Sequence, residues 1–179
     1  MRKNKNSNVK INEVKYPNIS IGNDEDNNIV EFKGGVLGQT CKVKITRNRK
    51  DYKKGKYIEL IEHSPLENSR NFCPQADICG GCAYQKLPYE TELMLKQDMV
   101  KKLLSENNIY YEGDIPINRS PVTQGFRNKM EYTFGDAHKG GKLILGLHRQ
   151  NRFYEIVDTI DCCLLYTSPK PTRRYAISY

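Results

Sequence analysis

Apolar and polar residues alternate over residues 9–63, and this period of two predicts short β-strands. Turn-forming residues, chiefly glycine, proline and asparagine, separate the runs. Five short strands in one compact segment favour a small β-barrel of the OB type. The expected strands are Val9–Val14, Ile19–Gly22, Asn28–Phe32, Thr40–Thr46 and Lys56–Ile61.

A helical period follows at residues 89–107, with Pro88 at its start, where a missing N–H is tolerated. One apolar stripe of this helix is expected to pack in the core, and it comprises Leu93, Val100, Leu103 and Leu104. Three more strands are expected, at Lys129–Phe134, Lys142–His148 and Phe153–Val157. One helix against an antiparallel sheet predicts a small α+β domain.

These patterns divide the chain into four segments. We expect a disordered N-terminus at 1–8, the barrel at 9–65 and the α+β domain at 66–165. The segment 166–179 contains two prolines and has no periodicity, which predicts an irregular tail. We expect this tail to be an unrelated sequence joined after about Leu165.

Net charge is +8 over 179 residues, and it is unevenly distributed. Residues 1–65 carry 14 basic and 8 acidic side chains (+6), residues 66–165 carry 12 and 13 (−1), and residues 166–179 carry 3 and none (+3). Such concentrated positive charge indicates an anionic partner. Only 37% of the residues are hydrophobic, so a large core is not expected and a metal clip would help the fold.

The location expected from the sequence is the cytoplasm. The first residues lack the apolar stretch of a signal peptide, and no apolar run approaches the roughly 20 residues of a membrane span. In a reducing cytosol, cysteines bind metal more often than they form disulfides. We expect a monomer with no membrane partner.

The segment Lys42–Lys56 carries eight lysines and arginines against one aspartate. Lys42 and Lys44 alternate with apolar residues and share a strand face, while Arg47 and Arg49 follow in the turn. Two interpretations stay open at this point. The segment is either a solvated hairpin or a contact to the phosphates of single-stranded nucleic acid.

Cys73, Cys79 and Cys82 have C-x5-C-x2-C spacing, and Cys162 lies far downstream. Three clustered thiolates and one distant thiolate are a common ligand set for an iron–sulfur cluster. Structural zinc is the alternative, although zinc favours two separated cysteine pairs, and unliganded cysteines are a third possibility. Adjacent side chains of extended backbone point to opposite sides, so Cys162 and Cys163 are not both expected to bind the metal.

Cys41 lies within a predicted strand, and we expect it to be a small buried residue because no activating base is evident near it. The three histidines, His63, His138 and His148, stand apart in the sequence. We assign none of them a catalytic role.

Several motifs together resemble the iron–sulfur RNA uracil-5-methyltransferases. The cysteine cluster is followed by Tyr84-Gln85-x-Leu87-x-Tyr89, and later come Phe126-Arg-Asn-Lys-Met-Glu131 and Gly146-Leu-His-Arg. Ile156-Val-Asp and Asp161-Cys162 complete the set. The resemblance covers about residues 8–165, and it is specific as a set, since each motif alone is weak.

The resemblance implies that the barrel is a TRAM domain that binds RNA. It implies a central α+β domain with a 4Fe–4S cluster held by Cys73, Cys79, Cys82 and Cys162. Cys162 is preferred over its neighbour because it follows Asp161 as in the family. Cys163 is then expected to be a spare core residue.

The family implies S-adenosylmethionine-dependent methylation of uridine C5 in ribosomal RNA, foremost 23S, or in transfer RNA. The chain would supply RNA recognition, because no glycine-rich loop follows a strand and no cofactor-binding or catalytic residue is expected within it. Alone it is expected to be inactive. The alternative is a stand-alone RNA-binding module with a structural metal. A radical enzyme is disfavoured, because its usual spacing is C-x3-C-x2-C.

Arg127 and Lys129 flank Asn128 at the start of a predicted strand. Both are assigned to RNA contact on the family match, and a solvated strand end is the alternative. Arg149 and Arg152 are weaker candidates for the same role.

Overall fold

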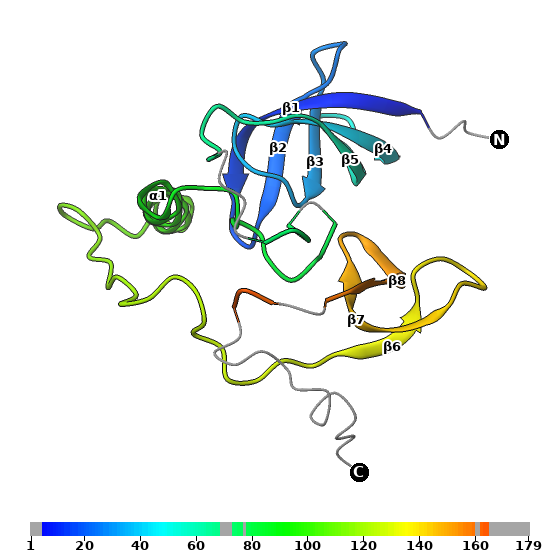
Figure 1. Ribbon diagram of the computed structural model, residues 1–179. Helices are drawn as coiled ribbons and strands as arrows, with labels where there is room; N and C mark the ends of the chain where they lie inside the picture. Colours follow the sequence, from blue (N-terminus) through cyan, green and yellow to red (C-terminus); the bar gives the residue numbers. More distant parts are fainter. Residues whose placement is uncertain (1–4, 69–72, 77, 160–161, 165–179) are drawn as a thin grey trace. The chain divides into compact units, whose positions relative to one another are not determined.

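The computed structural model describes residues 5–68, 73–76, 78–159 and 162–164 (Figure 1). Contacts divide the chain into two compact units. Unit 1 comprises Met1–Ser69 and Lys86–Asn118, and unit 2 comprises Arg70–Gln85 and Arg119–Tyr179. Each unit is therefore assembled from two separate stretches of sequence.

Unit 1 contains a closed barrel of five strands in the order β1-β2-β3-β5-β4, as the alternation predicted. β1 pairs with both β2 and β4, and all pairs are antiparallel except β3–β5. Closure leaves no unpaired sheet edge. The strands are β1 Asn6–Lys15, β2 Ile19–Asn23, β3 Ile29–Lys33, β4 Thr40–Asn48 and β5 Lys53–Glu62.

The N-terminus corrects one expectation. β1 begins at Asn6, and Asn6–Lys10 pair with β4, so residues 6–8 are strand and not disordered. The partner strand supplies backbone hydrogen bonds that outweigh the low apolar content of this stretch. The expected tail at 166–179 lies outside the described residues.

The barrel core comes from alternate positions of its strands. Ile11 is 1% exposed, and Val9, Val30, Val43 and Cys41 are fully buried, so the expected burial of Cys41 is confirmed. Burial raises the pKa of the Cys41 thiol to about 12, which makes it a neutral core residue.

Asp24 fastens the β2–β3 turn to the start of β5. Its side chain is only 1% exposed and accepts hydrogen bonds from Lys53 Nζ (2.6 Å) and the Asn28 backbone N–H (2.8 Å). Burial by itself would raise the pKa of Asp24, but the bonds from Lys53 and Asn28 outweigh it and lower the pKa to about 2.

Helix α1, Tyr89–Glu106, forms where predicted and belongs to unit 1 with the barrel. Its C-terminal half meets β1 through two ion pairs, Lys102–Glu13 (2.9 Å) and Lys15–Glu106 (2.6 Å). The sequence analysis grouped this helix with the later strands in one domain, whereas the contacts group it with the barrel. The α+β arrangement of the second domain therefore stays a prediction.

The expected apolar stripe of α1 is only partly buried. Leu93 and Met99 are buried, but Val100 and Leu103 are 42% and 40% exposed. The stripe prediction is wrong at these two positions. The reason is that charged side chains, rather than apolar ones, connect the C-terminal half of the helix to β1.

Unit 2 contains a three-stranded antiparallel sheet in the order β6-β7-β8. The strands are β6 Thr133–Asp136, β7 Leu143–Arg149 and β8 Arg152–Asp158. β6 begins four residues later than the alternation from Lys129 predicted. From Lys129 to Asp136, only Thr133–Asp136 pair with β7, and further upstream the Gly125 and Arg127 N–H groups donate to the carbonyls of Cys163 and Leu164.

Candidate cysteine pocket and nucleic-acid interface

The turn that carries Cys79 is hydrogen-bonded to the β7–β8 hairpin. The Gly80 N–H donates to the His148 carbonyl (3.0 Å), and the Gln150 N–H donates to the Ile78 carbonyl (2.9 Å). A Cβ at residue 80 would lie 3.0 Å from the same His148 carbonyl oxygen, so glycine permits this close approach. The turn therefore has a fixed position on the sheet of unit 2.

The distant cysteines are brought to the same place by short backbone bonds to residues 125–127, at 2.8 Å from Gly125 and 2.6 Å from Arg127. One largely apolar cavity of unit 2 is lined by five of the six cysteines of the chain. Its sulfur-bearing residues are Cys73, Cys79, Cys82, Cys162 and Cys163. The four predicted ligands thus lie around one cavity, together with Cys163.

Polar groups of the described residues donate hydrogen bonds to two of these sulfur atoms. The Gly81 N–H donates to Cys79 Sγ (3.4 Å) and Gln85 Nε2 donates to Cys163 Sγ (3.3 Å). Thr159 also lines the cavity, and its buried Oγ1 has no hydrogen-bond partner among the described residues. A buried hydroxyl without a partner is unfavourable by about 1–3 kcal/mol. A ligand in the cavity that accepted a hydrogen bond from the Thr159 hydroxyl would remove this cost.

Burial is the largest of the effects that raise the pKa values of three thiols in this cavity. The pKa of Cys79 is raised, that of Cys82 is about 12 and that of Cys163 is about 11. Neighbouring thiols raise these values further, because two thiolates repel each other. The protonated sulfurs would have to lose protons to bind a metal.

The chemistry of the donors fits a soft metal centre, because five thiols and one unpaired hydroxyl surround the cavity. In the described residues, however, the thiols do not converge on a single metal position. Within the described ranges, no three His, Cys, Asp or Glu side chains form a group that could hold a metal ion. The choice between Cys162 and Cys163 as a ligand stays a prediction, since both line the cavity.

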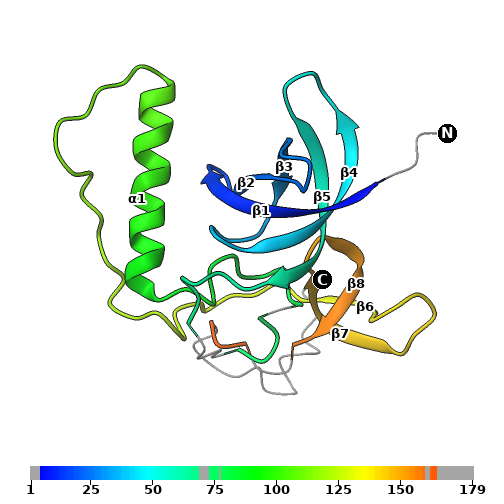
Figure 2. The ribbon, with the colours of Figure 1, turned by 90° about the horizontal axis from the view of Figure 1, so that it is seen from above.

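The predicted basic segment forms the projecting β4–β5 hairpin of the barrel (Figure 2). Three of its cations are in ion pairs, namely Lys42 with Glu59 (2.9 Å), Lys53 with Asp24 (2.6 Å) and Lys54 with Glu31 (3.9 Å). The cations without an ion pair to any described residue are Lys44, Arg47, Arg49, Lys50 and Lys56. These five cations make the hairpin a candidate phosphate-binding surface.

Arg127 and Lys129 are exposed in unit 2 and lie before β6, not within it. Lys129 forms a solvent-exposed ion pair with Glu131 (3.3 Å), and Arg127 lies 3.8 Å from Met130 Sδ. Both side chains are accessible to an anionic ligand. Their assignment to RNA contact stays a prediction.

A feature that the sequence did not predict is an aromatic cluster on the β7–β8 hairpin. Phe153 and Tyr154 are 72% and 90% exposed, and the Phe153 ring stacks on His148 at 4.6 Å between centroids. From the sequence alone, this stretch is predicted to be an ordinary strand, because aromatic residues favour strands. The exposure of two adjacent rings is the signal that the structure adds.

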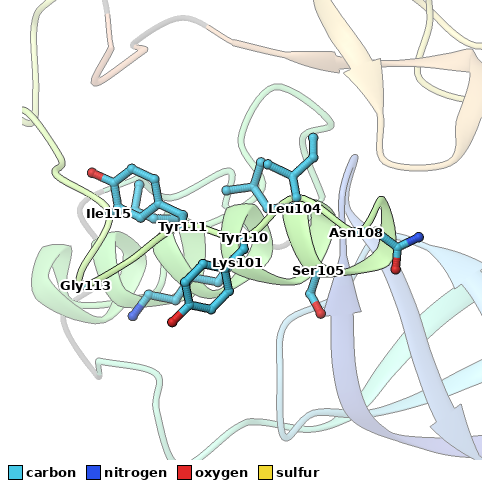
Figure 3. A pocket seen from close by; sticks show the side chains of 9 residues that line it. Lys101, Leu104, Ser105, Asn108, Tyr110, Tyr111, Gly113 and Ile115 are labelled. Carbon is cyan, nitrogen blue, oxygen red and sulfur yellow. The ribbon is translucent and has the colours of Figure 1, made fainter.

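An open groove of about 510 Å³ lies beside the end of α1 (Figure 3). Lys101, Tyr110 and Tyr111 line it, but Lys101 is paired with Asp114 (2.8 Å). The segment 89–118 has six acidic residues and three lysines, all three of which are in ion pairs. This net charge of −3 disfavours a phosphate ligand at the groove.

Known proteins resemble this chain over most of its length, although no protein-family model matches it. It is 42% identical to an uncharacterized RNA methyltransferase of Caldanaerobacter subterraneus subsp. tengcongensis over 86% of the chain and 34% of that protein. Uncharacterized RNA methyltransferases of Clostridium tetani and Clostridium acetobutylicum are 38% and 36% identical, each over 90% of the chain and 35% of the relative. The chain thus spans about a third of the length of these curated relatives.

A solved structure has a similar fold. It is the Pyrococcus abyssi tRNA (uracil-54, C5)-methyltransferase in complex with S-adenosyl-L-homocysteine, with a TM-score of 0.52 and 19% identity over 93% of this chain and 34% of that one. No helix in the described part of the chain has the length and apolar character of a membrane span. The chain is thus similar in sequence to bacterial proteins named RNA methyltransferases, and it matches about one third of their length.

Proposed function

We propose that this chain is the RNA-recognition part of an S-adenosylmethionine-dependent RNA (uracil-C5)-methyltransferase. The proposal rests on a closed barrel whose β4–β5 hairpin carries five cations with no ion pair to a described residue, in a chain similar to RNA methyltransferases. A closed five-stranded barrel with a basic surface is a common scaffold for single-stranded nucleic acid. The target is ribosomal RNA, foremost 23S, or transfer RNA.

Catalysis is assigned to the two thirds of the relatives that the chain does not match. In the full reaction a cysteine thiolate would add to uracil C6, and C5 would take the methyl group from the sulfonium of S-adenosylmethionine; a base would then remove the C5 proton as the C6–S bond breaks and the thiolate leaves. The chain's role is to bind and position the RNA. It is expected to transfer no labelled methyl group from S-adenosylmethionine to RNA, and measurable transfer by the purified chain would contradict this division.

RNA binding is tested by fluorescence anisotropy with a single-stranded, uridine-containing oligonucleotide at several salt concentrations. For single strands the logarithmic salt slope is about −0.7 per phosphate neutralised. Replacing Arg47, Arg49 and Lys50 by alanine should therefore weaken binding and reduce the slope by about 2. The three substitutions, combined in one variant, remove cations that have no ion pair among the described residues.

The matched control is Lys96→Ala, Lys101→Ala and Lys102→Ala, which changes the net charge by the same amount on α1. It should leave the salt slope nearly unchanged, because these lysines already neutralise carboxylates. If both triple variants reduce the slope equally, net charge alone explains binding and the hairpin is not the binding surface.

The cysteine cavity is proposed to hold a 4Fe–4S cluster through Cys73, Cys79, Cys82 and Cys162. What supports it is the gathering of thiols from two distant segments around one apolar cavity. A bound cluster there would cross-link residues 73–82 to residue 162 and accept the Thr159 hydroxyl as a hydrogen-bond donor. Anaerobically reconstituted chain should contain about four iron atoms.

The competing function is a stand-alone RNA-binding module with structural zinc. It predicts stoichiometric zinc, without iron, in chain purified anaerobically. That result would overturn the cluster while leaving the RNA-binding proposal in place. Gain of methyl transfer when the remaining part of a relative is added would exclude the stand-alone module.

A further inference from the structure

The β7–β8 hairpin carries three rings, of which Phe153 contacts both of the others. His148 and Phe153 stack with centroids 4.6 Å apart and planes 11° from parallel, while Phe153 and Tyr154 meet edge to face at 5.5 Å. One face of the Phe153 ring is covered by His148, and the 72% exposure of this residue means that its other face is open. A further flat ring could extend the stack on this open face.

The position of this stack is fixed by the backbone around it. The His148 carbonyl accepts the Gly80 N–H from the cysteine turn, and His148 Nε2 lies 3.5 Å from Thr133 Oγ1 on β6. The hairpin reverses at Asn151, which has a positive φ of 58°, a conformation that asparagine tolerates. The rings therefore stand on a hydrogen-bonded hairpin, which lowers the entropy lost when a ligand stacks on them.

Charge distinguishes this aromatic cluster from the tyrosines beside α1. Arg149 and Arg152 both contact Glu155, at 3.4 Å and 2.6 Å, so two guanidinium groups share one carboxylate and one positive charge remains. The groove at Tyr110 and Tyr111 lies instead in a segment of net charge −3. Open aromatic faces next to surplus arginine match a nucleobase joined to phosphate.

We propose that Phe153 and Tyr154 form a stacking platform for an unpaired RNA base, with Arg149 and Arg152 contacting the adjacent phosphates. The proposal rests on the RNA-binding function proposed above and adds a second site to it, in unit 2. The hairpin of the barrel supplies salt-dependent affinity without base contact, whereas stacking on the two rings depends little on salt and only the arginine contacts beside them are salt-dependent.

The test uses the full chain and a single-stranded, uridine-rich RNA with one 2-aminopurine, whose fluorescence falls when it stacks. Phe153→Leu and Tyr154→Leu keep apolar side chains but remove the aromatic faces. Each should lower RNA affinity about 5- to 100-fold and restore the probe fluorescence, with the salt slope unchanged. Phe153→Trp should retain both affinity and quenching. Because both side chains are exposed, the melting temperature should not change.

Tyr110→Leu is the matched control, because Tyr110 is 89% exposed but lies in the acidic segment. It should alter neither affinity nor quenching. If RNA binds through the barrel hairpin and the leucine variants at 153 and 154 bind equally well, the platform is refuted and the proposed function stands. If the unmodified chain binds no RNA, the proposed function fails, and the platform fails with it.

Discussion

The barrel and the cysteine unit are stabilised in different ways. The barrel has continuous ladders around a closed sheet and a core of side chains at or near zero exposure. Unit 2 has three strands, and its buried apolar residues are few, namely Cys79, Ile156, Val157 and Leu164 in its described part. Phe126, Phe134, Leu143 and Phe153 of the same unit are 46–72% exposed. A small unit with so little core needs a metal or another staple, whereas the barrel does not.

The largest expected effect is loss of the proposed iron–sulfur cluster from unit 2. Cys162→Ser should release the cluster and destabilise unit 2 by about 3–5 kcal/mol, by analogy with a cross-link that closes a loop of this length. Hydrogen exchange should then show loss of amide protection in β7 and unchanged protection in β4. Iron content should fall in parallel.

Cys163→Ser is the control for this experiment and should leave iron content unchanged. If Cys163→Ser removes the iron and Cys162→Ser does not, the ligand assignment is wrong by one residue. If neither variant loses iron, the downstream cysteines do not close the site.

A core deletion in the barrel should have the opposite pattern. Ile11 is 1% exposed, and Ile11→Ala should destabilise the barrel by about 2–5 kcal/mol through lost burial and a residual cavity. Protection in β1 and β4 should fall while iron content stays constant. Loss of iron in this variant would show that the two units do not unfold independently.

Acid provides a smaller effect confined to the barrel. The pKa of Asp24 is about 2 in the folded chain, below its ordinary value of 3.8, so its contribution is present above pH 4 and is lost as the pH falls toward 2. This contribution is about 2 kcal/mol. Asp24→Asn should remove that part of the pH dependence in urea unfolding between pH 2 and 6. If the free energy of unfolding of Asp24→Asn depends on pH as that of the unmodified chain does, the Lys53–Asp24 pair does not cause the loss of stability in acid.

The smallest effect concerns the attachment of α1 to β1. The Lys102–Glu13 pair is partly exposed on both sides, so a double-mutant cycle with alanine should give a coupling of at most about 1 kcal/mol. A coupling of zero, with no change in α1 amide protection, would mean that this ion pair does not hold the helix on the barrel.

Sequence predicted the barrel well because its strands alternate around one core, and partners such as Val9 and Cys41 lie opposite each other in register. It failed for β6 because alternation from Lys129 says nothing about whether a partner strand lies alongside. It also failed for Val100 and Leu103, since a helical stripe does not reveal what the helix meets. Thiol spacing predicted the gathering of the cysteines, but the platform at Phe153 depends on solvent exposure, which a sequence does not encode directly.

The two-part composition of unit 2 has a consequence for the order of synthesis. A chain grows from its N-terminus at about 5–20 residues per second, and Cys162 lies 80 positions after Cys82. The first three thiols are therefore made roughly 4–16 s before the fourth. The barrel strands end at Glu62 and are complete before any of these cysteines is made. Translation thus completes the barrel sequence first and three thiols of the cavity second, and the set of five thiols is complete only at Cys163, 81 residues after Cys82.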